Sequence, residues 1–331
     1  MSLTTFWKAR RILVTGGSGF IGSHLIERLL SEGASVRTCG RNRDRFRAML
    51  GFTANDVEFF EGDLRSEDFC SEIVGGCEAV FHLAGKVAGV GYNSKHPGTI
   101  FFENAILGQQ VMNAAARSDC ERFLLVSTAC VYRRHCLVPT PEREGFIDDP
   151  EPTNLGYGWA KRSLEAQARC YAQEFPMKIG IARPYNAYGP RDNFEWETSH
   201  VIPALIRKCL EGHDPLVVWG DGSQSRSFLY VSDFVEGLLR VLEHYPVCDP
   251  VNIGSEEEIT IGDLARLLLK ITGSKAQLCF DAQGPAGQPR RNGDFSKARE
   301  KAGFGAKVVL CEGLARTVEW YLKSRAQCQV R

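Results

Sequence analysis

The chain has 331 residues, of which 44% are hydrophobic, and it carries 40 basic against 40 acidic side chains. This composition is ordinary for a folded globular protein and excludes a disordered, collagen-like or coiled-coil chain. Zero net charge argues against a broad nucleic-acid or membrane-surface footprint, so neither is expected as a partner. The length leaves room for two lobes and a large core.

The chain lacks the usual signals for export or membrane insertion. No apolar run reaches the ~20 residues that a membrane helix needs, and the N-terminal segment passes from a short polar start into a β-prone run. The twelve cysteines are scattered and form no Cys-x-x-Cys pair. This pattern favours free thiols over a disulfide or zinc framework. We therefore expect a cytoplasmic protein without a metal site.

Short apolar runs alternate with helical patterns through the first half of the chain. Strands are predicted at residues 11–15, 35–39, 57–60, 79–84, 123–127 and 178–182. Helices are predicted between them, notably at residues 21–30, 104–117 and 157–174. This alternation indicates an α/β fold with a doubly wound parallel sheet and right-handed crossovers, the Rossmann type.

The alternation of strands and helices ends at about residue 185. A loop-rich stretch follows, with short β-prone pieces at 215–219 and 250–254. The helical pattern at 231–243 is expected to return to the first lobe. These features predict a second, smaller α/β lobe built from separate chain segments. We place the first domain at residues 1–185 plus about 227–250, and the second lobe at about 186–226 and 251–331.

Glycines follow the first predicted strand. Residues 15–22 read Thr-Gly-Gly-Ser-Gly-Phe-Ile-Gly and lie between a strand and a helix. A tight turn and a close approach of backbone to a pyrophosphate require residues without Cβ, and the helix N-terminus supplies amide donors. The strand–turn–helix context favours a dinucleotide site over an incidental glycine-rich turn. The expected cofactor contacts in this loop are Gly16, Gly19, Phe20, Ile21 and Gly22.

The end of the second predicted strand indicates which dinucleotide binds. An NAD site usually has Asp or Glu there for the ribose 2′-hydroxyl, but this chain has no acid before Asp44. Arg41 and Arg43 stand there instead, and arginines pair bidentately with a 2′-phosphate. The pattern favours NADP(H) over NAD, although an ordinary solvated turn carries similar charges. Further cofactor contacts are expected after the third and fourth strands, at Asp63, Leu64 and Ala84.

A Tyr-x-x-x-Lys motif starts the helical pattern at 157–174. Tyr157 and Lys161 lie four residues apart, so a helix places them on one face. A tyrosine with a pKa of ~10 needs a nearby cation for proton transfer at neutral pH. Lys161 supplies that cation and is also expected to hold the nicotinamide ribose. Thr128, after the fifth strand, is expected to hydrogen-bond a substrate oxygen beside Tyr157. Taken alone, such a motif is frequent by chance and usually structural.

Together, the glycine loop, the hydroxyl after a later strand and the Tyr-x-x-x-Lys motif resemble the extended short-chain dehydrogenase/reductase superfamily over essentially the whole chain. Residues 186–193, 218–228 and 288–294 resemble the segments with which its nucleotide-sugar-modifying members hold their substrate. The resemblance implies a nucleoside-diphosphate sugar in the second lobe, preferably GDP-linked, and a homodimer formed through the helices 104–117 and 157–174. It assigns the substrate to Lys86, Asn186, Val201, Arg207, Trp219, Arg226, Arg291 and Asp294.

Two further positions narrow the resemblance. Cys130, and the run 199–205 that contains His200, are similar to the GDP-L-fucose synthase family, in which a cysteine and a histidine exchange protons with sugar carbons 3 and 5. A C4 ketone acidifies both neighbouring C–H groups, and epimerisation needs one group to remove a proton and another to return one. The pKa values of a thiol and an imidazole can be tuned to neutrality. The structural alternatives are a small buried cysteine and a capping or core histidine.

We therefore expect an NADP-dependent 3,5-epimerase/4-reductase that acts on a nucleoside-diphosphate 4-ketohexose. The resemblance has departures, because Thr128 stands where a serine is common and residues 133–135 replace an expected proline. Other segments are equally similar to the GDP-mannose 3,5-epimerase family, whose base is commonly a lysine at the place of His200. A redox-neutral 3,5- or 4-epimerase with tightly bound NAD(P) stays as the alternative. A non-catalytic, redox-sensing NADP-binding protein is the third.

Overall fold

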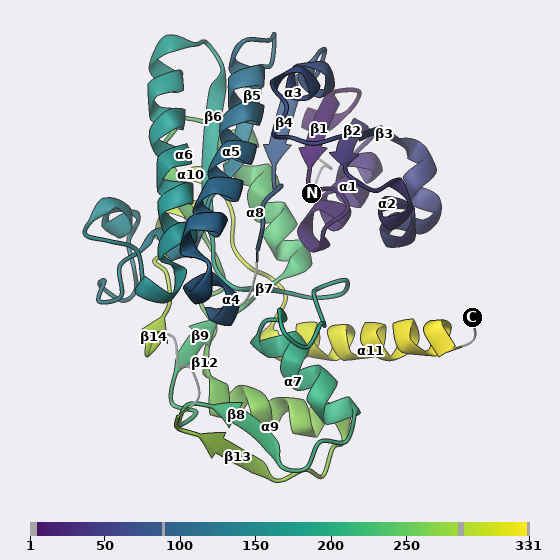
Figure 1. Ribbon diagram of the computed structural model, residues 1–331, viewed down its shortest axis with the longest axis vertical. Coiled ribbons are helices and arrows are strands. Elements are labelled where there is room, and N and C mark those ends of the chain that lie inside the picture. Colours follow the sequence, from purple (N-terminus) through teal and green to yellow (C-terminus); the bar gives the residue numbers. More distant parts are fainter. Residues whose placement is uncertain (1–4, 88–89, 284–287, 330–331) are drawn as a thin grey trace.

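A parallel sheet of seven strands forms the centre of the first lobe, in the order β11-β6-β5-β4-β1-β2-β3 (Figure 1). The computed structural model describes residues 5–87, 90–283 and 288–329. The strands of this sheet are β1 (Arg11–Thr15), β2 (Ser35–Gly40), β3 (Val57–Glu61), β4 (Ala79–His82), β5 (Arg122–Val126), β6 (Lys178–Pro184) and β11 (Pro250–Ile253). The predicted doubly wound α/β fold is confirmed.

Helices cover both faces of the sheet, as expected for strands that are apolar on both sides. One face packs against α1 (Phe20–Ser31), α2 (Arg43–Leu50), α8 (Val231–His244) and α10 (Ser296–Ala302). The other packs against α3 (Glu67–Val74), α5 (Pro97–Ala116) and α6 (Leu155–Glu174). Helix α5 begins at Pro97 rather than at the predicted residue 104, since proline suits the first helical position. Within the described ranges, no helix is long and apolar enough to cross a membrane.

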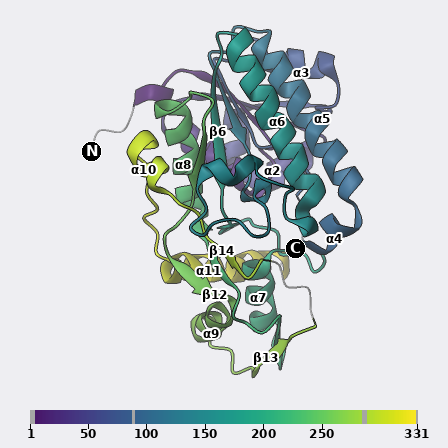
Figure 2. The same cartoon turned by 90° about the vertical axis from the view of Figure 1, so that its left-hand side faces the viewer.

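The second lobe lies beyond the carboxyl ends of the sheet strands (Figures 1 and 2). Strands β8 and β13 pair in parallel, while β9 lies between β12 and β14. Helices α7 and α9 bury apolar residues at helical spacing against these strands and α11, which gives the lobe its own core. Its elements are α7 (Val201–Leu210), β8 (Leu216–Trp219), β9 (Ser225–Ser227), β12 (Glu258–Thr260), α9 (Ile261–Thr272), β13 (Leu278–Asp281), β14 (Arg290–Arg291) and α11 (Leu310–Gln329).

Two short strands join the lobes, and other short elements occur elsewhere along the chain. The two-residue strands β7 and β10 pair in parallel where the chain passes from one lobe to the other. The short elements are β7 (Ala187–Tyr188), β10 (Leu229–Tyr230), α4 (Val90–Lys95) and 3-10 helices at Thr5–Trp7, Gly51–Asp56, Ala129–Val131, Glu142–Phe146 and Pro152–Asn154. The 3-10 helix at Ala129–Val131 follows β5 directly, so it holds Cys130 at the carboxyl edge of the sheet.

The structure differs from the expected domain boundary near residue 250. Strand β11 pairs in parallel with β6 and forms an edge of the large sheet. Helix α10 buries Ala298 and Ala302 in the core beneath α8. Both segments therefore belong to the first lobe, although the expectation placed residues 251–331 in the second. The physical reason is that Val251 and Ile253 of β11 are fully buried in the core of the first lobe.

A cluster of charged and imidazole groups ties α1 to the chain that enters the second lobe. Arg191 donates to both carboxylate oxygens of Glu27, at 2.8 and 2.6 Å, and also contacts the His24 ring. His24 Nε2 lies 2.9 Å from the Pro190 carbonyl oxygen. Arg191 has a φ of 68°, so its backbone adopts a strained left-handed conformation at this point. The cluster fixes the path of the chain between the lobes.

Candidate active site

The glycine loop between β1 and α1 forms a cradle that only residues without side chains fit. Gly16 has a φ of 75°, and a Cβ there would lie 2.9 Å from the Ala84 backbone nitrogen. A Cβ on Gly22 would lie 2.2 Å from the Gly16 carbonyl oxygen. Gly19 precedes α1 as its N-cap, so the first amides of the helix point into the loop. The loop fits the pyrophosphate of a dinucleotide, as the sequence predicts.

The first turn of α1 packs away from the loop, toward the second lobe. Ile21 contacts both the first-lobe core and the second-lobe core, and Phe20 contacts the second-lobe core. Ala84 lies beside the loop, since its backbone nitrogen donates to Thr15 Oγ1 at 3.1 Å. These predicted cofactor contacts therefore lie around a single loop at the carboxyl end of β1.

The residues predicted to bind the adenosine part of the cofactor follow strands β2 and β3. Arg41 is exposed just beyond β2. Arg43 donates to the Phe59 carbonyl oxygen at 3.0 Å and lies over the Phe59 ring, so its guanidinium is already engaged. Asp63 pairs with Arg65 at 2.5 Å, while Leu64 is buried in the core. Of the two arginines predicted for a 2′-phosphate, Arg41 is therefore the freer one.

The Tyr-x-x-x-Lys motif lies in the first turns of α6, next to the end of β5. The Lys161 ammonium donates to the Val126 carbonyl oxygen at 2.8 Å and lies 5.7 Å from the centre of the Tyr157 ring. Burial lowers the pKa of Lys161 to about 8 and raises the pKa of Tyr157 above its ordinary value. Thr128 Oγ1 accepts from the Cys130 amide at 3.1 Å. A hydroxyl that stays protonated beside a buried cation is suited to donate a proton.

Cys130 lies against an arginine from the far end of the chain. Arg291 of β14 donates from Nη2 to Cys130 Sγ at 3.3 Å. The positive charge of Arg291 also lowers the pKa of Tyr157, against the larger effect of burial. This contact joins the predicted acid–base cysteine to a partly buried cation. The predicted acid–base cysteine and the Tyr-x-x-x-Lys motif therefore surround one charged group.

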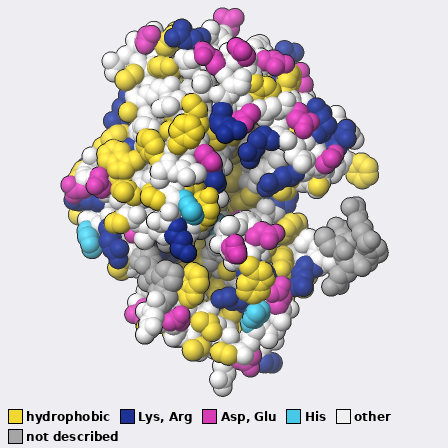
Figure 3. Space-filling model, viewed as in Figure 1, with side chains coloured by type: hydrophobic (Ala, Val, Ile, Leu, Met, Phe, Trp, Pro, Cys, Tyr) yellow, Lys and Arg dark blue, Asp and Glu magenta, His cyan; other side chains and the backbone are white. Residues whose placement is uncertain are grey.

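His200 lies at the start of α7 in the second lobe, within electrostatic reach of Arg291. It is the N-cap of α7 and is exposed to solvent. The protein around its ring lowers the pKa of the imidazole, and the positive charge of Arg291 lowers it further. His200 is therefore open to a ligand, and its surroundings favour the neutral imidazole. Figure 3 shows the surface hollowed between the two lobes, with Lys and Arg side chains along the rim.

The predicted substrate residues fall into two groups. Arg226 lies on β9 beside β14, where burial and the charge of Arg291 lower its pKa to about 10. Trp219 is exposed at the end of β8. Asn186 donates to the Ser227 carbonyl oxygen at 2.8 Å, and Val201 is the first residue of α7. Of these four residues, Arg226 lies directly beside Arg291, its partner in the pairing of β9 with β14.

The remaining three predicted substrate residues are engaged by the protein itself. Lys86 pairs with Glu103 at 3.1 Å. Arg207 is buried, with its guanidinium 3.7 Å from the centre of the Trp196 ring. Asp294 accepts from the Ser296 amide at 3.0 Å at the start of α10. The structure does not bring these three side chains to Arg291.

Comparison with known proteins identifies the family of this chain. A family model described as "NAD dependent epimerase/dehydratase family" matches residues 12–254. The chain belongs to this family. It is 34% identical over 326 residues to the probable GDP-L-fucose synthase 1 of Oryza sativa subsp. japonica, covering 96% of this chain and 93% of that one. It is 30% identical to GDP-mannose 3,5-epimerase 1 of the same plant, covering 95% and 83%.

A solved structure agrees with this assignment. The UDP-glucose 4-epimerase of Thermotoga maritima, determined with UDP-glucose, superposes with a TM-score of 0.86 at 30% identity, covering 95% of this chain and 99% of that one. The resemblance to the extended short-chain dehydrogenases/reductases, and the prediction of an NAD(P)-dependent enzyme, are confirmed. The family thereby explains why a nucleotide loop and a second lobe are joined in one chain.

A buried ion pair behind the epimerase/dehydratase site was not predicted. Glu165 accepts from Arg183 at 2.6 Å, and both side chains are essentially inaccessible. Glu165 also accepts from the Ser127 hydroxyl at 2.5 Å, which fixes the residue before Thr128. Its charge opposes the effect of burial on the pKa of Lys161. One feature of the sequence indicates that Glu165 lies near Lys161: the two residues are four positions apart and therefore share a helical face.

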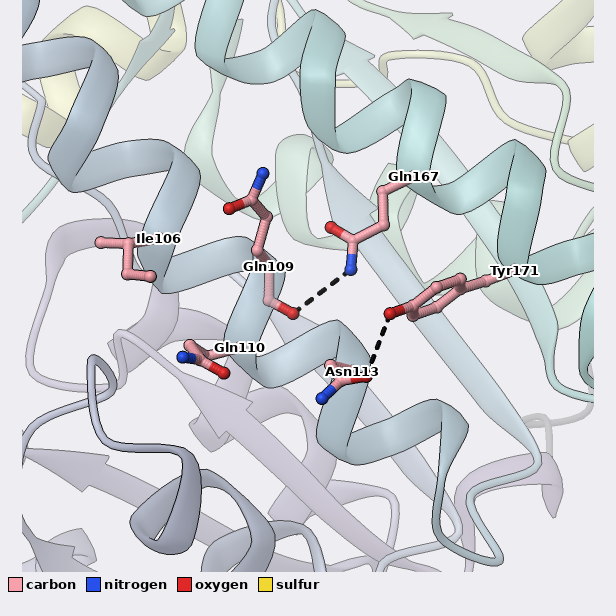
Figure 4. Close-up of a pocket in the computed structure, with 6 residues that line it drawn as sticks. All are labelled: Ile106, Gln109, Gln110, Asn113, Gln167 and Tyr171. Atoms are coloured by element: carbon pink, nitrogen blue, oxygen red, sulfur yellow. Dashed lines mark hydrogen bonds between the residues drawn. The ribbon is translucent and has the colours of Figure 1, made fainter.

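Helices α5 and α6 carry a separate surface pocket, away from these groups (Figure 4). Gln167 donates to the Gln109 carbonyl oxygen at 3.3 Å, and the Tyr171 hydroxyl donates to Asn113 at 3.0 Å. The pocket is lined by Ile106, Gln109, Gln110, Asn113, Gln167 and Tyr171. Its neutral amide lining provides no group suited to the chemistry of the family.

The lowered pKa of Lys161 predicts a pH dependence for this enzyme. Lys161 is charged below about pH 8 and loses its proton as the pH rises through that value. The charge supports proton release by Tyr157, so we expect kcat/KM for carbonyl reduction to fall above about pH 8. Lys161→Arg keeps its charge to far higher pH, so that variant should lose the decline even if its activity is low. An unchanged basic limb in Lys161→Arg would contradict this assignment.

Proposed function

We propose that this family member is an NADP(H)-dependent 3,5-epimerase/4-reductase of a nucleoside-diphosphate 4-ketohexose, with GDP as the favoured nucleotide. The observation that supports the proposal is that Arg291 donates to Cys130 and acts electrostatically on both Tyr157 and His200. A thiol, a phenol and an imidazole at one place are the groups that proton exchange and carbonyl reduction on one sugar require. Relatives named GDP-L-fucose synthase and GDP-mannose 3,5-epimerase support a GDP-sugar.

We assign the proton exchange of the epimerisation to Cys130 and His200. A ketone at C4 of the sugar acidifies the C–H bonds at C3 and C5. One of the two side chains removes a proton from such a carbon, and the other returns one to the opposite face, which inverts the centre. Arg291 donates to the sulfur of Cys130 and holds it in place, and the lowered pKa of His200 favours the imidazole form that accepts a proton.

The reduction half belongs to Tyr157 and Lys161. When bound, the nicotinamide dinucleotide supplies the hydride that reduces the ketone, and the glycine loop with Gly16 and Gly22 would hold it. Tyr157 gives its proton to the oxygen at C4, and Lys161 stabilises the phenolate that forms. Thr128 orients the ketone oxygen from the end of β5. The raised pKa of Tyr157 supports this role, because the hydroxyl keeps its proton until the reaction requires it.

A redox-neutral epimerase is the second candidate. The chain's 30% identity to a GDP-mannose 3,5-epimerase favours it. In this alternative the substrate sugar has no ketone, and the oxidation state of the nucleotide cofactor is the same before and after the reaction. The same side chains could serve both reactions, so the two candidates are distinguished by the substrate that the protein converts.

One experiment separates the two candidates. The purified protein is incubated with GDP-4-keto-6-deoxymannose and NADPH, and in parallel with GDP-mannose without added cofactor. We expect NADPH absorbance to fall with the ketosugar, in proportion to the product formed. Conversion of GDP-mannose without consumption of cofactor would instead establish the epimerase. If neither sugar were converted, both candidate functions would be contradicted.

We further infer a homodimer formed through α5 and α6, and cytoplasmic location stays a prediction from the sequence. Four large apolar side chains are exposed at the N-terminal ends of these two helices, and pairing with a second copy would cover them. They are Phe101, Phe102, Leu155 and Trp159. The amide-lined pocket in Figure 4 lies on the same two helices. A four-helix contact of this kind leaves the cleft between the lobes open.

A further inference from the structure

An arginine outside every predicted site lies beside an incompletely satisfied carboxylate. Glu151 is buried, and its Oε2 accepts from the Thr153 amide at 3.0 Å. Its Oε1 is also buried but has no hydrogen-bond partner in the part of the chain that the structure describes. The nearest cation is Arg134, whose Nη1 lies 3.7 Å from Oε1, too far for a hydrogen bond. The side chain of Arg134 is 41% exposed.

The charge of Glu151 acts on three arginines. Its negative charge raises the pKa of Arg226 and of Arg291, so it lies within electrostatic reach of both. With Arg134 this makes three guanidinium groups around one carboxylate. Burial, and next the positive charge of Arg291, lower the pKa of Arg226. Glu258 also raises the pKa of Arg226 but is itself paired with Arg290. Guanidinium groups therefore outnumber carboxylates in this cluster, which suits an anionic diphosphate.

The loop of Arg134 is tied to the loop of Arg291. The buried Gln288 donates from Nε2 to the carbonyl oxygens of Arg133 and Arg134, at 3.0 and 3.2 Å. Further along, Thr140 and Gly293 form a parallel bridge. These contacts hold the backbone at Arg134 beside β14, which carries Arg291. The guanidinium of Arg134 is partly exposed and lies 3.7 Å from Glu151, so an incoming anion can reach it without breaking a hydrogen bond between the two side chains.

We propose that Arg134 is a substrate-binding residue that leaves Glu151 to pair with the diphosphate of the sugar nucleotide, beside Arg226 and Arg291. This inference rests on the proposed function and adds a residue to it. Arginine suits the role, because its planar donors pair with two phosphate oxygens at once. When the dianion is bound, Glu151 keeps its contacts to Thr153 and continues to balance part of the charge.

The test compares Arg134→Gln with Arg133→Gln by titration calorimetry. Arg133 is a matched control, since it precedes Arg134 but already pairs with Glu144 and Asp148. The probes are GDP-mannose, UDP-glucose and NADPH. We expect Arg134→Gln to weaken the sugar nucleotide that the native protein binds by about 10-fold or more, with NADPH affinity unchanged. Arg133→Gln should leave both affinities close to native.

Three outcomes would overturn the proposal. Native affinity of Arg134→Gln for the sugar nucleotide would show that Arg134 does not bind the diphosphate. Equal losses for the sugar nucleotide and NADPH, together with a lower melting temperature, would show that Arg134 only supports the fold. A native protein that binds NADPH but neither sugar nucleotide would overturn the proposed function itself, and the role of Arg134 with it. The second probe keeps the test independent of the nucleotide base.

Discussion

Cys130→Ser and His200→Asn are expected to abolish the exchange of sugar protons with solvent while hydride transfer persists. Each variant removes one of the two groups that exchange protons at C3 and C5, and general acid–base catalysis contributes about 10²- to 10⁴-fold. We therefore expect deuterium entry at C3 and C5 to fall at least 100-fold when the ketosugar is incubated in heavy water, as measured by NMR. Oxidation of NADPH should fall much less, because Tyr157 and Lys161 remain.

A second cysteine provides the control for this experiment. Cys136 is six residues further along, and its sulfur lies 3.3 Å from the Thr140 hydroxyl. Cys136→Ser should keep the native exchange rate. If deuterium entered at the native rate in both Cys130→Ser and His200→Asn, the epimerase half of the proposal would have to be abandoned.

Tyr157→Phe is expected to lower the rate of ketone reduction by about three orders of magnitude. The variant removes the only hydroxyl of the Tyr-x-x-x-Lys motif and leaves the ring that packs near Lys161. Affinity for NADPH should stay native, since Lys161 and the glycine loop are unchanged. Stopped-flow absorbance at saturating ligand measures the reduction step directly.

Tyr171→Phe is the matched control for this prediction. Tyr171 lies on the same helix α6, but its hydroxyl donates to Asn113 on the α5 face, away from the cleft. We expect native kcat from Tyr171→Phe. A Tyr157→Phe protein that reduced the ketone at the native rate would show that another group donates the proton to C4.

The fold was predictable because its signals are local. Apolar runs of strand length, separated by helical patterns and interrupted by glycines at β1, are sufficient to indicate a doubly wound sheet. The glycine loop, Tyr157 and Lys161 were predictable for the same reason, since each motif occupies a few consecutive residues. Cys130 and His200 needed the resemblance to a family, because neither residue has a distinctive local pattern.

Long-range contacts were not predictable. The sequence does not reveal that β11 pairs with β6, or that Arg291 lies 3.3 Å from a sulfur 161 residues earlier. The predicted roles of Arg207 and Asp294 are not supported by their contacts for the same reason: the first is held by Trp196 and the second by Ser296. The buried Glu165–Arg183 pair joins α6 to β6, and only the packing of the two elements brings it together.

The late position of β11 and α10 has a consequence for synthesis. Without β11, strand β6 keeps an open edge, and without α10 part of the apolar surface of α8 stays in water. The nascent chain therefore has to release about nine-tenths of its length from the ribosome before the first lobe is complete. An open edge beside an uncovered apolar surface invites wrong pairing. We expect this chain to depend on chaperones during translation more than a protein whose first lobe ends at residue 185.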